Sequence, residues 1–215
     1  MVIETIIYVA LLIALFCVCD NSLSRRYYVP LKVVCSASFL VILWINQCLS
    51  EKLWLMLWAL LAFFIGDMLM AFYNIYRNKR VIALGIIAFM LGHVGLLNYM
   101  CRITSKTSVL VYILPIIFCV LLLIVRKIFK LHFGSLLVPC IIHCYFISTM
   151  TIKAIECGFE GYPLYPLAGI LFLLSDITII FLYFYHYHSL RNKKIAHYIN
   201  LGTYYIAILL FIYSL

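Results

Sequence analysis

Long apolar stretches separated by short polar segments run along the whole chain. A helix needs about 20 predominantly apolar residues to cross the hydrocarbon core of a bilayer. Eight stretches approach this length, and each is expected to form a membrane-spanning helix. Their predicted bounds are Ile3–Cys19, Val29–Leu49, Leu53–Tyr73, Val81–Cys101, Val109–Val125, Leu131–Met150, Pro166–Tyr185 and His197–Leu215.

No polar segment between these stretches is long enough to form a soluble domain. The pattern therefore predicts an all-α polytopic membrane protein, with residues 1–215 forming a single bundle of about eight transmembrane helices. Glu4 opens the first stretch, no basic segment precedes it and no small-residue cleavage pattern follows, which favours a retained helix over a signal peptide. Pro30 is expected at the start of the second helix, where its missing N–H costs little.

The composition agrees with this class. The chain has 215 residues, of which 67% are hydrophobic and 11% are charged, whereas a soluble domain of this size needs more polar surface. The cysteine count is nine, an odd number, and Cys17, Cys35, Cys119 and Cys140 lie inside apolar stretches. Such cysteines are typical of packing residues in membrane helices rather than of a disulfide framework.

The formal net charge of +9 comes from basic residues in the short loops, so it predicts topology and not nucleic-acid binding. The loops after the first, third, fifth and seventh stretches hold Arg25, Arg26, Arg77, Lys79, Arg80, Arg126, Lys127, Lys130, Arg191, Lys193 and Lys194. The other loops hold Lys52, Arg102, Lys106 and Lys153 beside Glu51, Glu156 and Glu160. The positive-inside rule then places the odd-numbered loops in the cytoplasm and both termini outside it.

Two carboxylates interrupt the apolar stretches. Asp67 follows Gly66 and is the only charged residue within Leu53–Tyr73, and Asp176 follows Ser175 in the seventh stretch. Placing one such charge at the centre of a membrane helix costs roughly 2.5–3.5 kcal/mol on insertion scales. An ionisable residue at this depth is therefore a candidate functional residue.

Three further polar residues lie inside predicted spans, namely Lys32, His93 and His143. Each has a simpler alternative: Lys32 could reach the cytoplasmic interface, and either histidine could be a hydrogen-bonded core residue. Together with Asp67 and Asp176, the histidines could supply the three or more ligands that a metal site needs. No helix carries a pair of histidines four residues apart, so no metal and no other cofactor is predicted.

Two carboxyl groups in a low-dielectric site can divide into one neutral acid and one anion, as in acid–base enzymes. The acid can protonate a substrate, and the anion can stabilise an oxocarbenium-like cation or activate water. No G-x-S-x-G turn supports an acyl-enzyme. Two alternatives stay open: a proton-coupled transporter or lipid-binding protein using the same aspartates, and, less favoured, a metal-dependent lipid amidase.

Particular motifs add a family resemblance. The stretch Gly66-Asp67-Met68-Leu69 resembles the Gly-Asp signature of the YhhN family, the lysoplasmalogenase-like membrane proteins. Phe89 and His93 follow in the next predicted span, with the spacing and at the place that this family shows.

Later motifs extend the resemblance over nearly the whole chain. Phe172-x-x-Ser175-Asp176 resembles the family's second signature, an apolar helix with a Ser-Asp pair, and Pro30-Leu31 resembles the Pro-Leu that begins the family's second helix. Departures exist as well. Val29 stands where the family usually has lysine, so a phosphate-binding role for Lys32 is in doubt, and Ile208 stands where a glutamine is frequent.

The resemblance implies hydrolysis of the vinyl ether bond of a lysoplasmalogen, giving a fatty aldehyde and a glycerophospho-ethanolamine or -choline. It implies that Asp67 and Asp176 are the catalytic pair. The expected partners are a lysophospholipid substrate and membrane lipid, and the setting is a bacterial cell membrane or a eukaryotic endomembrane. The residues expected to bind substrate or support the pair are His93, Lys32, Ser175 and Tyr204.

Overall fold

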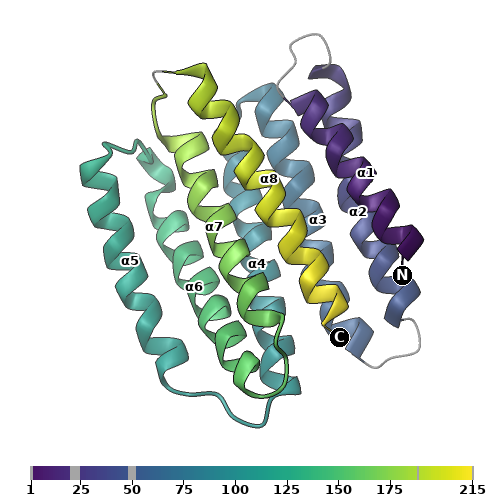
Figure 1. Ribbon diagram of the computed structural model, residues 1–215. Coiled ribbons are helices and arrows are strands. Elements are labelled where there is room, and N and C mark those ends of the chain that lie inside the picture. The colour runs from purple at the N-terminus through teal and green to yellow at the C-terminus, as the bar shows by residue number, and fades with distance from the viewer. Residues whose placement is uncertain (1, 20–24, 48–51, 188, 215) are drawn as a thin grey trace. The chain divides into compact units, whose positions relative to one another are not determined.

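The computed structural model describes residues 2–19, 25–47, 52–187 and 189–214, and the regular structure in these residues is helical throughout. The helices follow one another through short connections (Figure 1). Their bounds are α1 (Val2–Cys19), α2 (Arg25–Gln47), α3 (Lys52–Tyr76), α4 (Lys79–Ile103), α5 (Leu110–Ile128), the short 3₁₀ helix η2 (Gly134–Leu136), α6 (Leu137–Phe159), α7 (Tyr165–Phe184) and α8 (Leu190–Tyr213).

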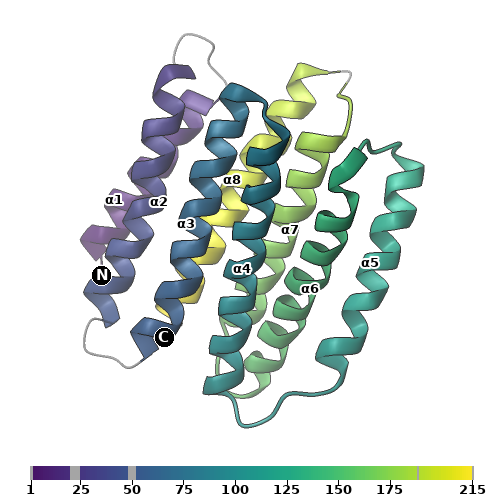
Figure 2. The same cartoon turned by 180° about the vertical axis from the view of Figure 1, so that it is seen from behind.

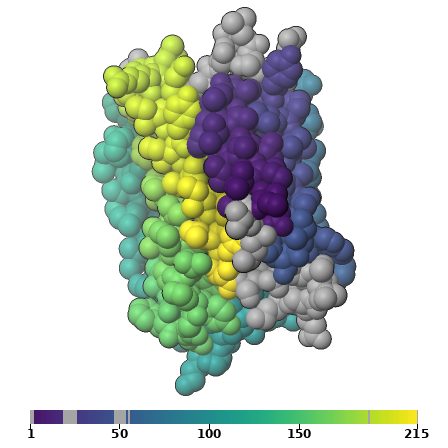
Figure 3. Space-filling model, turned by 45° about the vertical axis from the view of Figure 1, so that its right-hand side comes forward, coloured from purple at the N-terminus to yellow at the C-terminus, as the bar shows by residue number. Residues whose placement is uncertain are grey.

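Among the described residues, seven helices, α2 to α8, are long and apolar enough to cross a membrane. The apolar part of α1, Ile3–Val18, is shorter than the others. Large apolar side chains on the helix faces are exposed, as expected of surfaces that contact lipid; on α1 these include Ile3, Ile6 and Ile13. Figure 3 shows α1, in purple, at the molecular surface. The prediction of an all-α, multi-pass membrane protein is confirmed.

The chain divides into two compact units, Met1–Leu96 (unit 1) and Leu97–Leu215 (unit 2), with the boundary inside α4. The first three helices and most of α4 belong to unit 1, while the end of α4 and α5 to α8 belong to unit 2. The single eight-helix domain expected from the sequence stays a prediction.

Unit 1 is built on close helix contacts. Helix α2 packs against both α1 and α3 (Figure 2), and α3 contacts α4 through glycines. A Cβ atom added at Gly92 of α4 would lie 2.3 Å from the ring of Phe63 on α3, and one at Gly95 would lie 2.8 Å from the Cβ of Ala59. Small residues permit such close approach of two membrane helices, where van der Waals packing replaces the hydrophobic effect as the driving force.

Unit 2 is a run of sequential neighbours, in which α5 packs on α6, α6 on α7 and α7 on α8 (Figure 1). Gly169 of α7 lies against α6, where an added Cβ would be 2.8 Å from the Cβ of Ala154. The connections are fixed to the helices as well. The backbone N–H of His132, between α5 and α6, donates to the carbonyl of Phe184 at the end of α7.

A loop of residues 104–108 is bound to the last turns of α6. Glu156 accepts from the backbone N–H of Ser108, and Glu160 accepts from the N–H of Ser105. The ammonium of Lys153, whose residue is fully buried, donates to the carbonyl of Lys106 at 2.6 Å and to Glu156 at 2.9 Å. We call these contacts the α6 clasp.

The bounds of the sixth helix were wrong in the sequence analysis. It was expected over Leu131–Met150, but α6 runs from Leu137 to Phe159, so Lys153 and Glu156 are helical and not loop residues. The earlier start was wrong because Gly134, at φ +54, opens a 3₁₀ turn. The later end is possible because the clasp satisfies both charged side chains inside the helix.

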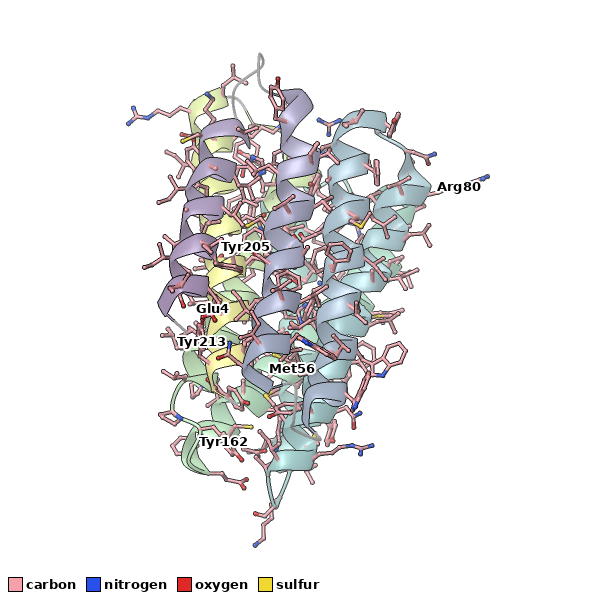
Figure 4. All side chains as sticks on the ribbon, turned by 90° about the vertical axis from the view of Figure 1, so that its right-hand side faces the viewer. Glu4, Met56, Arg80, Tyr162, Tyr205 and Tyr213 are labelled. Carbon is pink, nitrogen blue, oxygen red and sulfur yellow. The ribbon has the colours of Figure 1, made fainter. Side chains whose placement is uncertain are left out.

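The starts of two other helices also differ from expectation. Helix α2 begins at Arg25, so Pro30 lies inside the helix and not at its first turn. Helix α8 begins at Leu190, seven residues before the predicted start at His197, because polar residues form its exposed first turns. At the start of α4, Arg80 points away from the helices (Figure 4), as expected of a charged residue at a helix end.

Candidate active site

Asp67 forms the polar centre of unit 1. It lies on α3 and is 2% exposed. Its Oδ1 is 3.0 Å from the Nζ of Lys32, and its Oδ2 accepts a hydrogen bond of 2.7 Å from the hydroxyl of Ser36. Lys32 and Ser36 are four residues apart, so both project from the same face of α2 toward α3. One helix thus supplies both a charge and a hydroxyl to the carboxylate.

The Lys32–Asp67 contact is a buried ion pair, since the two side chains are 9% and 3% exposed. The sequence left open whether Lys32 reaches out to the membrane interface; in the structure it points at Asp67 instead. Removing one member of such a pair leaves an uncompensated buried charge and typically costs about 3–5 kcal/mol. The position of Lys32 therefore explains how a carboxylate is tolerated within α3.

His93 is fully buried on α4, within unit 1. Its ring meets the ring of Phe63 on α3 edge-on, with the centroids 5.1 Å apart. Phe89, one turn earlier on α4, faces the same ring at 6.1 Å. The absence of a side chain at Gly92 gives Phe63 the room to sit beside His93. The motif residues Phe89 and His93 therefore share one helix face, packed on α3.

Asp176 is the matching polar residue of unit 2. It lies on α7 and is 5% exposed. Its Oδ2 is 2.6 Å from the Nε2 of His143 on α6, and the two side chains are 7% and 14% exposed. A carboxylate oxygen and an imidazole nitrogen approach this closely when a hydrogen lies between them. From the sequence, His143 could be a core histidine or a metal ligand, because nothing in the 33-residue separation links it to Asp176.

The residue before Asp176 fixes α7 to α8. Asn200 of α8 donates to the hydroxyl of Ser175 at 2.8 Å and to its carbonyl at 3.1 Å. Ser175 in turn donates to the carbonyl of Asn200 at 3.3 Å. Asn200 was not among the residues predicted from the sequence, although a lone amide within an apolar stretch was a usable signal. It holds the backbone next to the catalytic candidate in place.

Tyr204 lies one turn after Asn200 and is 3% exposed. It meets Phe172 of α7 edge-on, with ring centroids 5.4 Å apart. Phe172 and Ser175, two residues of the second motif Phe172-x-x-Ser175-Asp176, both contact α8. The structure thus places Ser175 and Tyr204 in the α7–α8 contact, where they support the position of Asp176; a role in binding substrate stays a prediction.

Most of the predicted site residues fall into two groups, one in each unit. Unit 1 joins Lys32 to Asp67, and unit 2 gathers Ser175, Asp176 and Tyr204 around the α7–α8 contact. A catalytic zinc site uses three protein ligands. Within unit 2, His143 and Asp176 lie close enough together to supply two of them.

The comparisons with known proteins agree with the motifs. The model of the YhhN family matches residues 26–215, a range that begins near the start of α2 and contains every site residue discussed above. No curated protein and no solved structure matches the chain. Because the family model covers most of the sequence, the chain belongs to the YhhN family.

Proposed function

We propose that this protein is an integral membrane hydrolase that cleaves the vinyl ether bond of lysoplasmalogens. The products are a fatty aldehyde and a glycerophospho-ethanolamine or -choline. One observation carries the proposal: each of two membrane-spanning helices holds a buried aspartate within hydrogen-bond distance of a basic side chain on the preceding helix. Lys32 is that side chain for Asp67, and His143 is that side chain for Asp176.

The chemistry of the substrate calls for these two kinds of group. Hydrolysis of a vinyl ether begins when an acid adds a proton to the alkenyl carbon that does not bear the oxygen. The resulting oxocarbenium ion takes up water and loses a proton, and the hemiacetal then collapses to an aldehyde and an alcohol. An acid and an anion of the kind used by glycoside hydrolases serve these steps. The net reaction consumes one water.

The depth of the aspartates suits a lipid substrate. Asp67 is nine residues from the end of α3 at Tyr76, and Asp176 is eight residues from the end of α7 at Phe184. At a rise of about 1.5 Å per residue, each carboxylate lies about 12–14 Å from the end of its own helix. Each aspartate therefore lies more than two helical turns away from that end of its helix, where the apolar chain of a lipid could reach it.

The supporting residues take roles that follow from their contacts. Lys32 is proposed to hold the Asp67 carboxylate in position, and not to bind the substrate phosphate, because its ammonium is already paired. Ser175 and Tyr204 are proposed to position Asp176 through the α7–α8 contact. His93 is proposed to fix the packing of α4 on α3 near Asp67 through Phe63.

An aldehyde-release assay tests the proposal. Purified protein in nanodiscs is given a lysoplasmalogen or the matched ester lysolipid, with and without a chelator. We expect aldehyde from the vinyl ether alone, a loss of at least about 1,000-fold in Asp67→Asn and in Asp176→Asn, on the scale of removing an essential acid–base group, and no effect of the chelator. Thr178→Ala is the matched control on α7, since the Thr178 hydroxyl bonds only its own helix at the carbonyl of Leu174.

Other outcomes decide against the proposal. No aldehyde from folded protein, together with proton-linked lipid movement that needs the same aspartates, would indicate the transporter alternative. Release of product from an amide lipid, abolished by the chelator, would indicate the metal-dependent amidase.

A further inference from the structure

One end of unit 2 carries a cluster of basic residues. Helices α5 to α8 pack on one another in sequence, so the end of α5, the end of α7 and the start of α8 lie at the same end of this unit (Figure 1). The basic residues there, which we call the basic end, are Arg126, Lys127, Lys130, Arg191, Lys193 and Lys194. We propose that the basic end binds the head groups of anionic phospholipids in the leaflet that it faces. This binding is independent of the reaction proposed above.

No acidic residue of unit 2 balances this charge. Residues 126–137 and 185–197 contain no aspartate and no glutamate. None of the six basic side chains forms an ion pair with a residue that the structure describes, and all except the half-buried Arg126 are exposed. At the opposite end of unit 2, by contrast, Lys153 is paired with Glu156. Neighbouring like charges repel each other, so anions from outside the chain stabilise the basic end.

The turn after α5 is fixed to the end of α7. The backbone N–H of Leu131 donates to the carbonyl of Arg126 at 3.0 Å, and that of His132 donates to the carbonyl of Phe184 at 2.9 Å. Lys130, at φ +51, adopts the left-handed conformation that glycine adopts with less strain. The backbone of the turn therefore gives no reason for a lysine at this position, whereas an anion bound to its exposed ammonium does.

Exposed apolar side chains are interleaved with these charges. Ile128 and Phe129, between two of the basic residues, are 66% and 45% exposed, and Leu190, beside Arg191, is 80% exposed. The ring of Phe129 also meets that of Phe181 on α7 edge-on, with the centroids 5.2 Å apart. Aromatic residues favour the head-group level of a membrane. A soluble anion would contact the charges alone, whereas a phospholipid offers its phosphate to the charges and its chains to the apolar side chains.

Basic residues at helix ends also set the orientation of a membrane protein during insertion. That role ends once the helices are in place, and it requires no lipid on the finished protein. Lipid binding, by contrast, persists in purified protein in detergent micelles, where orientation across a bilayer has no meaning. Binding measured in micelles therefore separates the two roles.

Native mass spectrometry of the full-length protein in micelles tests the proposal. The probes are phosphatidylglycerol, phosphatidylcholine with the same acyl chains, and soluble glycerophosphoglycerol, which is the anionic head group without chains. We expect phosphatidylglycerol to bind at least about tenfold more tightly than phosphatidylcholine, because each basic residue near an anionic head group strengthens binding about fivefold. The soluble head group should not displace the bound lipid.

Two triple variants remove the charges of each part of the basic end: Arg126→Gln/Lys127→Gln/Lys130→Gln and Arg191→Gln/Lys193→Gln/Lys194→Gln. Each should weaken binding of phosphatidylglycerol at least about fivefold and leave phosphatidylcholine unaffected. The matched control is Arg102→Gln/Lys106→Gln, which removes two charges at the opposite end of unit 2 and should bind both lipids as the wild type does.

A single variant keeps the comparison decisive if a triple variant fails to fold. Lys130→Gly removes one charge at a position that suits glycine, so it should weaken binding of phosphatidylglycerol about fivefold while the melting temperature stays within a few degrees of the wild type. Lys130→Arg, which keeps the charge, should bind like the wild type.

Three results would overturn the proposal. The first is equal affinity of the wild-type protein for the two lipids. The second is a preference for phosphatidylglycerol that every folded variant of the basic end retains, which would leave these residues with a role in topology alone. The third is binding of the soluble head group as tight as that of the lipid, which would indicate a site for a free anion.

Discussion

Asn200 of α8 donates two hydrogen bonds to Ser175 of α7, one to its hydroxyl and one to its carbonyl. The amide thereby holds both the side chain and the backbone of the residue before Asp176. We expect Asn200→Ala to lower kcat about 10- to 100-fold, because a misplaced reacting group has an effect of this size. Rescue of kcat by Asn200→Gln, or no loss in Asn200→Ala, would argue against a strict positioning role. Thr178→Ala serves as the control.

Ser36 offers a sharper test of the Asp67 environment. Its hydroxyl bonds the carboxylate, whereas the hydroxyl of Ser38, two residues later, bonds the carbonyl of Cys35 in its own helix. Losing a hydrogen bond to a charged group costs about 1.5–3 kcal/mol. Ser36→Ala should therefore lower thermal stability in detergent, and Ser38→Ala should not. Equal effects of the two substitutions would show that the hydrogen bond from Ser36 to Asp67 contributes no more to stability than the bond of Ser38 within its own helix.

Two glycines of α4 should respond differently to the same substitution. An added Cβ at Gly92 would lie 2.3 Å from the Phe63 ring, which is packed against His93, whereas one at Gly85 would meet the flexible end of Met70 at 3.0 Å. Gly92→Ala should destabilise the protein by about 1–3 kcal/mol through overpacking, with Gly85→Ala affecting it less. Unfolding measured by thiol accessibility in detergent reports both, and a more stable Gly92→Ala would contradict the packing described.

The α6 clasp predicts a stability difference between two acidic residues. Glu156 pairs with the fully buried Lys153, whereas Glu160 is exposed and binds the loop backbone. Glu156→Gln should lower the melting temperature clearly, because it leaves the Lys153 ammonium with the carbonyl of Lys106 in place of a counter-ion. Glu160→Gln should change it little, because Glu160 is exposed and the amide oxygen of glutamine can still accept the hydrogen bonds from Ser105. Similar shifts in melting temperature for the two variants would show that the buried Lys153 ammonium does not depend on Glu156 as its counter-ion.

The orientation expected from the loop charges is open to direct measurement. Reporter fusions after residue 78 and after residue 187 should indicate the cytoplasm, and one after residue 161 the opposite side. Reversed signals at all three positions would show that the basic loops do not set the topology of this protein.

The sequence was sufficient for the helical membrane class, because apolar periodicity of span length has few alternatives. It also singled out both aspartates as candidates, since a charge in an apolar stretch needs a reason to be there, and the structure shows both buried. It did not reveal their partners: Lys32 and Asp67 are 35 positions apart, and which face of α2 meets α3 depends on packing. The end of α6 was missed because Lys153 and Glu156 resemble loop residues until their mutual contact is known.

The clasp also bears on how the chain enters the membrane. Lys153 is a buried charge six residues before the end of α6, and a charge within a membrane helix is costly to insert. Glu156, three residues away on the same helix, can offset this charge before the loop of residues 104–108 is in place. Newly made Glu156→Gln chains should therefore insert α6 less often, so the yield of membrane-inserted protein should fall as well as its melting temperature.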